Sequence, residues 1–232
     1  VDVAHYEKVV GDMASEIRAT LPKSADTSKR LAALGNYMFK ENGFHGSRGD
    51  YYNRANSYLN EVIDDREGIP ITLSVLYMEL ARRLNLKIVG IGLPGHFVVA
   101  KLEDQEEPQL IDVFENAKFL TLKDATEIVR NFAGIQLKDD HLKPVDNRAI
   151  IVRMLRNLIG VSNDNEPSEV VLRYLNTLLL LQPNSPQERL NRALMYMRLK
   201  KNEKAKIDIR WLLDKNPPGF NQDRLLELFQ RL

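Results

Sequence analysis

The stretch GIGLPGHFVVAKLEDQEEPQLIDVFEN, residues 90–116, decides the fold class. Short apolar runs rich in Val and Ile within and just before it predict three strands, at 87–93, 96–102 and 108–114. An acidic turn, 103–108, separates the last two, so we expect a small antiparallel sheet. His96 begins the second strand and Asp112 lies inside the third. Such a pair commonly orients a third side chain that reacts with a substrate. The next question is whether the sequence contains this third side chain.

Helices precede this sheet. The segment Ile69–Leu84 is apolar around much of its circumference and predicts a central helix packed on the sheet, with Pro70 in its first turn, where a missing N–H costs nothing. Three further helices are expected, at 3–20, 27–40 and 57–63. The second of these would begin at Thr27 or Ser28, and a Gly-, Asn- and Ser-rich loop leads into the third. The fold class is therefore α+β.

The strand pattern stops at Thr121. Thr121 and Asp124 have the spacing of a capping box, and the helix that they open should end at Gly134. A polar, Pro-containing connection follows, which places a domain boundary near residue 145. We expect an α+β domain at 1–145 and an all-helical domain at 146–232. The helices predicted in the second domain are 146–160, 167–181, 186–199, 202–214 and 221–231.

The helical domain carries a repeat. Pro183 and Pro217 each follow a predicted helix and lie 34 residues apart, which is the tetratricopeptide period. Ala193 and Tyr196 have the small-x-x-Tyr spacing of the first repeat helix, where small residues let two helices approach closely. The pattern predicts two tetratricopeptide-like units and a closing helix, and generic helical hairpins are the alternative.

Composition excludes several function classes. The 33 basic and 32 acidic residues leave a net charge of +1 without a basic stripe, so we expect no nucleic-acid partner. Apolar runs are too short for a membrane span, no signal peptide is visible, and no membrane partner is expected. The chain has no cysteine, which excludes thiolate metal sites and a cysteine nucleophile and fits a reducing compartment, the cytoplasm or an organelle interior. No pair of His or acidic residues has metal-ligand spacing beyond the Asp pairs at 64–65 and 139–140, which are better explained as helix-end charges, so neither a metal nor another cofactor is expected.

Three segments resemble the transglutaminase-like superfamily: NSYLNEVIDDREGIPITLSVLYMELARRLNL at 56–86, GLPGHFVV at 92–99 and LIDVF at 110–114. The resemblance covers nearly the whole chain and points to a branch in which this domain is followed by tetratricopeptide repeats. Folds of the superfamily are similar to papain-like cysteine enzymes. They place a cysteine at the start of a central helix, which lowers the pKa of its thiol, a histidine on one strand and an orienting aspartate on the next.

Carried over by motif, the resemblance gives His96 and Asp112 the places of the family histidine and aspartate. The Gly-x-Cys pattern of the family aligns with Gly68-x-Pro70, so a proline stands where the nucleophile is expected. Proline has no nucleophilic group. At about 100° per residue, Ser74 returns to within about 40° of position 70 and is the only hydroxyl on that face, one turn deeper in the helix.

Polar residues just before the helix start are candidates for a relic cleft with Pro70 and Gly68. These residues are Asn53, Asn56, Ser57 and Arg66. By the resemblance they lie beside His96 and would shape a pocket that binds a peptide or an amide without cutting it. The alternative is that their side chains cap the short helix and satisfy loop backbone groups.

Two functions are consistent with these residues. In the first, a non-catalytic transglutaminase-like protein acts as an adaptor or regulator and binds protein or peptide segments through its repeats and its relic cleft. Tyr196, Arg189 and Arg192 are the candidate peptide-binding residues of the repeats, although such charges are most often solvated. In the second, an amide or ester hydrolase or acyl transferase uses His96 and Asp112 to activate Ser74 or a water. The alternative role for His96 is a structural imidazole bonded to Asp112.

Overall fold

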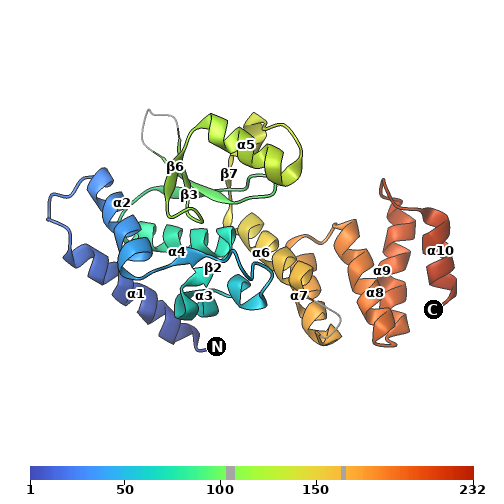
Figure 1. Ribbon diagram of the computed structural model, residues 1–232. Coiled ribbons are helices and arrows are strands. Elements are labelled where there is room, and N and C mark those ends of the chain that lie inside the picture. The colour runs from blue at the N-terminus through green and yellow to red at the C-terminus, as the bar shows by residue number, and fades with distance from the viewer. Residues whose placement is uncertain (103–107, 163–165) are drawn as a thin grey trace. The chain divides into compact units, whose positions relative to one another are not determined.

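The computed structural model describes residues 1–102, 108–162 and 166–232, and it divides the chain into two compact units, Val1–Ile150 and Ile151–Leu232 (Figure 1). The sequence placed this division at residue 145. Most of the predicted acidic turn, residues 103–107, lies outside the described residues. Within the described ranges, no helix combines the length and the apolar character that a membrane span requires.

The helices of the first unit largely follow the sequence pattern. They are α1 (Val3–Ala19), α2 (Thr27–Gly35), η1 (Asn36–Glu41), η2 (Arg54–Ser57), α3 (Leu59–Asp65), α4 (Pro70–Arg83), α5 (Leu122–Ala133) and η3 (Asp139–Leu142). The helix predicted at 27–40 continues from α2 into a π-helical turn, η1. Its N-cap is Asp26 rather than Thr27 or Ser28, because the Asp26 carboxylate accepts the Lys29 N–H at 2.8 Å. The capping box of Thr121 and Asp124 and the left-handed Gly134 at the end of α5 are confirmed.

The sheet has two more strands than the sequence predicted. Its strands are β3 (Ile88–Ile91), β4 (Val98–Lys101), β5 (Gln109–Asp112), β6 (Lys118–Leu120) and β7 (Pro144–Val145), in the order β6-β5-β4-β3-β7 with antiparallel pairing throughout. β6 and β7 contain three and two residues, too few for a strand periodicity to appear in the sequence. A separate parallel pair joins β1 (His45–Gly46) to β2 (Glu67–Gly68).

Each face of the sheet is buried by a different helix, as Figure 1 shows for α4 and α5. Alternate residues of the strands point to opposite faces. Val99 and Ile111 belong to the core formed with α1, α2 and α4, whereas Val98 and Leu110 belong to a smaller core with α5. Asp112 lies two residues after Leu110 and therefore faces the side of the sheet that α5 covers.

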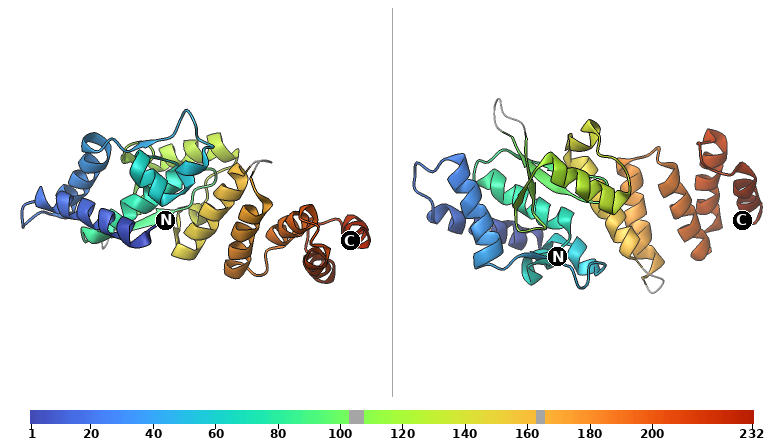
Figure 2. Two further views of the ribbon diagram at one scale, coloured as in Figure 1. Left: turned by 90° about the horizontal axis from the view of Figure 1, so that it is seen from below. Right: turned by 45° about the horizontal axis from the view of Figure 1, so that its top comes forward.

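The second unit is all-helical, and its helices follow one another closely along the chain. They are α7 (Ser168–Leu181), α8 (Pro186–Arg198), α9 (Asn202–Lys215) and α10 (Gln222–Gln230), preceded by α6 (Asn147–Val161), which begins in the first unit. Consecutive helices from α7 to α10 pack against each other (Figures 1 and 2). A core formed by α8, α9 and α10 includes the small residues Ala193 and Ala205, which permit close approach of α8 and α9. The five predicted helices are present, and the tetratricopeptide assignment itself stays a prediction.

Candidate functional site

His96 and Asp112 form a buried hydrogen-bonded pair at one end of the sheet. His96 lies just before β4, and Asp112 ends β5, its antiparallel neighbour. This pairing brings the start of one strand to the end of the other. The Nε2 atom of His96 lies 2.9 Å from Oδ2 of Asp112, and the two side chains are 6% and 3% exposed.

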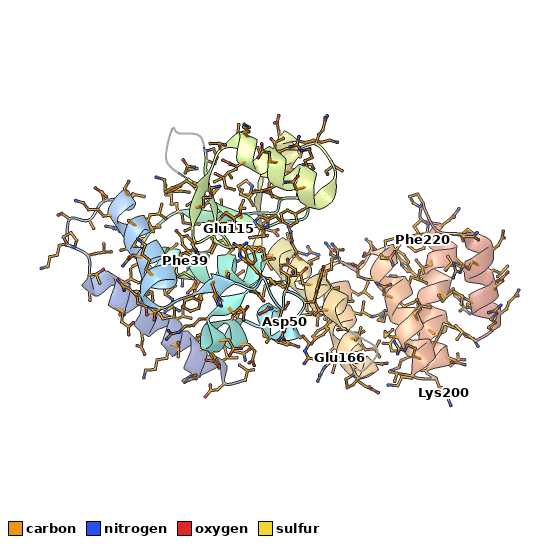
Figure 3. All side chains as sticks on the ribbon, in the orientation of Figure 1. Phe39, Asp50, Glu115, Glu166, Lys200 and Phe220 are labelled. Atoms are coloured by element: carbon orange, nitrogen blue, oxygen red, sulfur yellow. The ribbon has the colours of Figure 1, made fainter. Side chains whose placement is uncertain are left out.

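The Asp112 carboxylate is held on both of its oxygens. Oδ2 contacts the imidazole, and Oδ1 accepts the backbone N–H groups of Phe114 and Glu115 at 3.1 and 3.3 Å. Glu115, labelled in Figure 3, lies in the turn at 113–117, and the aspartate before this turn organises it. A carboxylate bonded in this way has a fixed position, so the imidazole ring that it contacts is also oriented.

The start of α4 lies beside the parallel pair of β1 and β2. Pro70 is the first residue of α4, and Thr72 Oγ1 accepts the Ile69 N–H at 3.1 Å and donates to the Asn56 carbonyl at 2.7 Å. At the other strand, the Ser47 N–H donates to the Gly68 carbonyl at 2.9 Å. A Cβ atom at Gly68 would lie 2.9 Å from Thr72 Oγ1, so a larger residue would displace the Thr72 side chain. These bonds fix Ser47 next to the helix start.

A cavity of about 680 Å³ opens over the His96–Asp112 pair, and we call it the cleft. Pro70, Ser47 and Gly95 line it together with the pair. Its remaining lining is aromatic, charged or apolar, apart from the amide of Asn131: Tyr51, Tyr52, Phe114, Phe132, Arg48, Glu115, Lys118, Asp124, Glu127, Leu120, Ile128 and Asn131. This volume falls within the range of small-molecule and side-chain binding sites.

Five rings in contact cross the cleft, and we call them the aromatic row: Tyr52, Tyr51, Phe114, His96 and Phe132. Neighbouring ring centroids lie 5.4, 6.4, 6.2 and 5.7 Å apart in that order. The first three contacts are edge-to-face, whereas His96 and Phe132 stack with an interplanar angle of 10°. Tyr52 and Phe132, at the two ends, are 77% and 66% exposed. Rings this exposed are available to a ligand.

Of the residues predicted for the relic cleft, Pro70 lines the cavity with His96 and Asp112. The five others, Gly68, Asn53, Asn56, Ser57 and Arg66, are not among the described lining residues. Asn53 caps η2 by accepting the Ala55 N–H, Asn56 donates to the Asp50 carbonyl at 2.8 Å, and Ser57 is buried. Arg66 has a left-handed backbone and donates to the Asn42 carbonyl at 2.9 Å. Their bonds organise the loop that leads to α4.

Ser74 lies in the interior of the first unit. Its side chain is fully buried, and its hydroxyl has no hydrogen-bond partner among the described residues. Ser74 is absent from the described lining of the cleft, whereas Ser47, whose hydroxyl is also buried and without a described partner, is part of that lining. Of these two buried serine hydroxyls, only that of Ser47 therefore belongs to the described lining of the cleft.

The predicted peptide-binding residues of the second unit have partners within it. Arg189 and Arg192 both pair with the fully buried Asp208, at 3.1 and 2.8 Å. Arg192 also lies 5.9 Å from the centre of the Tyr196 ring, and Arg189 lies 4.3 Å from that of Trp211. The two guanidinium groups, 16% and 20% exposed, thus bind a buried carboxylate, and a role in peptide binding stays a prediction.

Sequence reasoning missed most of the aromatic and charged lining of the cleft. The Tyr51–Tyr52 pair in a polar loop, and Phe114 and Glu115 directly after Asp112, were available signals, since exposed aromatic residues next to a candidate site are typical of binding surfaces. Phe132 and Glu127 gave no such signal. They lie on an amphipathic helix whose packing position the sequence does not specify.

Comparison with known proteins agrees with this geometry. Residues 4–156 match the family model described as the transglutaminase-like superfamily. The chain is 32% identical over 228 residues to a UPF0162 protein of Xylella fastidiosa strain 9a5c, covering 96% of this chain and 81% of the relative. It is 26% identical over 215 residues to Protein SirB1 of Salmonella typhimurium, covering 91% and 77%. Human F-box only protein 21 is 29% identical over 182 residues, which is 74% of this chain and 28% of that protein. The match over residues 4–156, which contain the whole cleft, shows that the chain belongs to the transglutaminase-like superfamily.

Proposed function

We propose that the protein is a non-catalytic member of its superfamily that binds peptide segments in the cleft. One observation carries the proposal: Pro70, which has no nucleophilic atom, lines the cleft beside an intact His96–Asp112 pair. The position that the family resemblance gives to a cysteine thus belongs to an inert ring. A site of this kind can still bind a ligand, but it cannot carry out thiol chemistry.

The lining of the cleft supports binding of an extended chain. Apolar and aromatic side chains supply contact area, and fixed polar groups supply orientation, which is the usual composition of a ligand site. Tyr and Phe rings bury large areas at a small entropic cost. The second unit, read as tetratricopeptide-like helices, would offer a further surface for protein segments, and the two together would act as an adaptor.

A second candidate function is hydrolysis or acyl transfer with water as the nucleophile. The 2.9 Å contact between His96 and Asp112 favours it, because a carboxylate-oriented imidazole is a competent general base. Ser74 gives this candidate little support, since its buried hydroxyl is not part of the described lining of the cleft. The two functions differ in whether a bound peptide or ester is recovered unchanged.

The test of peptide binding uses a matched pair of variants. Phe132 lines the cleft and is 66% exposed, whereas Phe119, in the same unit, is 57% exposed and not part of the described lining. Peptides selected from a displayed random library on the wild-type protein would be titrated against Phe132→Ser and Phe119→Ser. We expect Phe132→Ser to weaken binding about tenfold and Phe119→Ser to leave it unchanged. Equal affinities for both variants would refute binding in the cleft.

A further inference from the structure

We infer that the cleft recognises the guanidinium group of an arginine side chain in a bound peptide. This inference rests on the proposed peptide-binding function and specifies which side chain the cleft selects. Three observations carry it: the charge of the lining, the aromatic row, and an unsatisfied buried hydroxyl at the helix start.

The lining has an excess of negative charge. It contains four carboxylates, on Asp112, Glu115, Asp124 and Glu127, and two cationic side chains, on Arg48 and Lys118. Counted over these six side chains, the net charge of the lining is minus two. Arg48 pairs with Glu115 at 2.6 Å and Lys118 approaches Asp124 at 4.0 Å, while the exposed Glu127 has no ion pair among the described residues. A cationic ligand complements such a site, and an anionic one would be repelled.

The aromatic row favours the same ligand charge. The face of an aromatic ring attracts cations through its quadrupole, and guanidinium is the group that most often stacks there. Tyr52 and Phe132 present exposed rings at the two ends of the row. The chain itself contains an example, because the Arg48 guanidinium lies 5.5 Å from the centre of the Phe114 ring while it pairs with Glu115. A ring and a carboxylate of the cleft thus already bind one guanidinium group.

The Ser47 hydroxyl is an independent indication that the cleft binds a hydrogen-bond donor. Its side chain is fully buried, it lines the cleft, and its hydroxyl has no hydrogen-bond partner among the residues that the structure describes. Buried hydroxyls are ordinarily bonded, so this oxygen is suited to accept a hydrogen bond from a ligand. A guanidinium has five N–H donors and no acceptor, which matches a lining of carboxylates and a hydroxyl.

The position of Arg48 leads to an unusual expectation. Because Arg48 occupies the Phe114 ring and the Glu115 carboxylate, it competes with an incoming arginine for both. Its replacement by alanine would free the ring and make the lining more negative. An arginine peptide should then bind more tightly, whereas an acidic peptide or a C-terminal carboxylate, for which Arg48 would be a partner, should bind more weakly.

The experiment compares three peptides that differ at one side chain: Ac-Gly-Ala-Xaa-Ala-Gly-NH2 with arginine, citrulline or lysine as Xaa. Citrulline has nearly the shape of arginine without its charge. Titrations followed by amide NMR shifts of the full chain should show the arginine peptide binding about tenfold more tightly than the citrulline peptide. Glu127→Gln should weaken the arginine peptide and Arg48→Ala should strengthen it, each about threefold. Glu7→Gln, an exposed acid on α1 outside the described lining, is the matched control.

Each result of this experiment decides the inference. Equal binding of the arginine and citrulline peptides, equal binding of arginine and lysine, or weaker binding to Arg48→Ala would overturn it. The failure of peptide binding itself is separable, because library peptides that bind equally to Phe132→Ser and wild type would refute the proposed function. Library peptides that lose affinity to Phe132→Ser but show no arginine preference would leave that function standing and remove the guanidinium assignment.

Discussion

The imidazole of His96 stacks on the Phe132 ring, with centroids 5.7 Å apart and planes inclined by 10°. The histidine comes from the entry to β4 and the phenylalanine from the last turn of α5, so a helix that follows the sheet in sequence completes the cleft. One face of the ring is therefore covered by an exposed side chain, and its Nε2 edge is bonded to Asp112. This arrangement orients an imidazole within a binding surface.

Replacement of Asp112 tests how strongly the pair organises this end of the sheet. Asp112→Ala removes the acceptor of the His96 ring and of two backbone N–H groups, all at a buried position. We expect a loss of about 3 kcal/mol in the free energy of unfolding and a smaller loss of about 1 kcal/mol for Asp112→Asn, which keeps an acceptor. Urea denaturation, monitored by amide hydrogen exchange in β4 and β5, measures the loss in the free energy of unfolding for each variant. Equal, small losses below about 0.5 kcal/mol would show that the carboxylate organises nothing.

Two buried serines allow stability and binding to be separated. Ser47→Ala removes a hydroxyl that has no described partner, so we expect the free energy of unfolding to rise by about 1 kcal/mol while the arginine peptide binds more weakly. Ser74→Ala is the control, because its hydroxyl is also buried without a described partner but is not part of the described lining. It should raise stability and leave binding unchanged. A destabilised Ser47→Ala protein would mean that the hydroxyl already has a partner within the fold.

A cysteine introduced at position 70 tests whether the helix start keeps the geometry of an active site. The chain has no cysteine, so Pro70→Cys creates a single thiol at the first position of α4. The helix terminus and His96 should lower the pKa of this thiol. We expect alkylation by iodoacetamide at pH 6 about tenfold faster than for Pro186→Cys, which is the first position of α8, a helix of similar length.

The double variant Pro70→Cys with His96→Ala identifies the cause of this reactivity. If the imidazole assists, the rate should fall to that of Pro186→Cys. Equal rates for all three proteins would show that position 70 is not the structural equivalent of a nucleophile position. The cleft would then not be a relic of an active site.

In the second unit, Asp208 is predicted to be a major determinant of stability. Its carboxylate is fully buried and binds both Arg189 and Arg192, the latter through two hydrogen bonds of 2.8 Å. Asp208→Ala would leave two partly buried guanidinium groups without this carboxylate. We expect the free energy of unfolding to fall by about 3 kcal/mol. Trp211, the single tryptophan of the chain, lies over Arg189 and reports unfolding of this unit by fluorescence. An unchanged urea midpoint would contradict the assignment.

The sequence predicted the helices and the central strands because their periodicities are long enough to be read. The sequence also predicted that His96 and Asp112 lie close together, because adjacent strands of a small antiparallel sheet usually pair. The two short strands β6 and β7 were missed because two or three residues have no measurable period. The π-helical turn after α2 was missed because its composition continues that of an α-helix.

The lining of the cleft was less predictable because it depends on packing between distant elements. Phe132 reaches His96 only because α5 covers the face of the sheet that Asp112 points to. Arg189 and Arg192 were predicted to bind a peptide, with solvated charges as the alternative, and nothing in the sequence indicated that both pair with the buried Asp208. In each case the sequence identifies the residue but not which residue lies next to it in the fold.

The most direct test of the central claim measures binding and chemistry in the same sample. A library-selected peptide would be incubated with wild type, His96→Ala and Phe132→Ser, with its affinity followed by titration and its mass by mass spectrometry. We predict that the wild-type protein binds the peptide, that Phe132→Ser binds it more weakly, and that the peptide mass stays unchanged with every protein. Cleaved or acylated product that appears with wild type and disappears with His96→Ala would contradict a non-catalytic cleft.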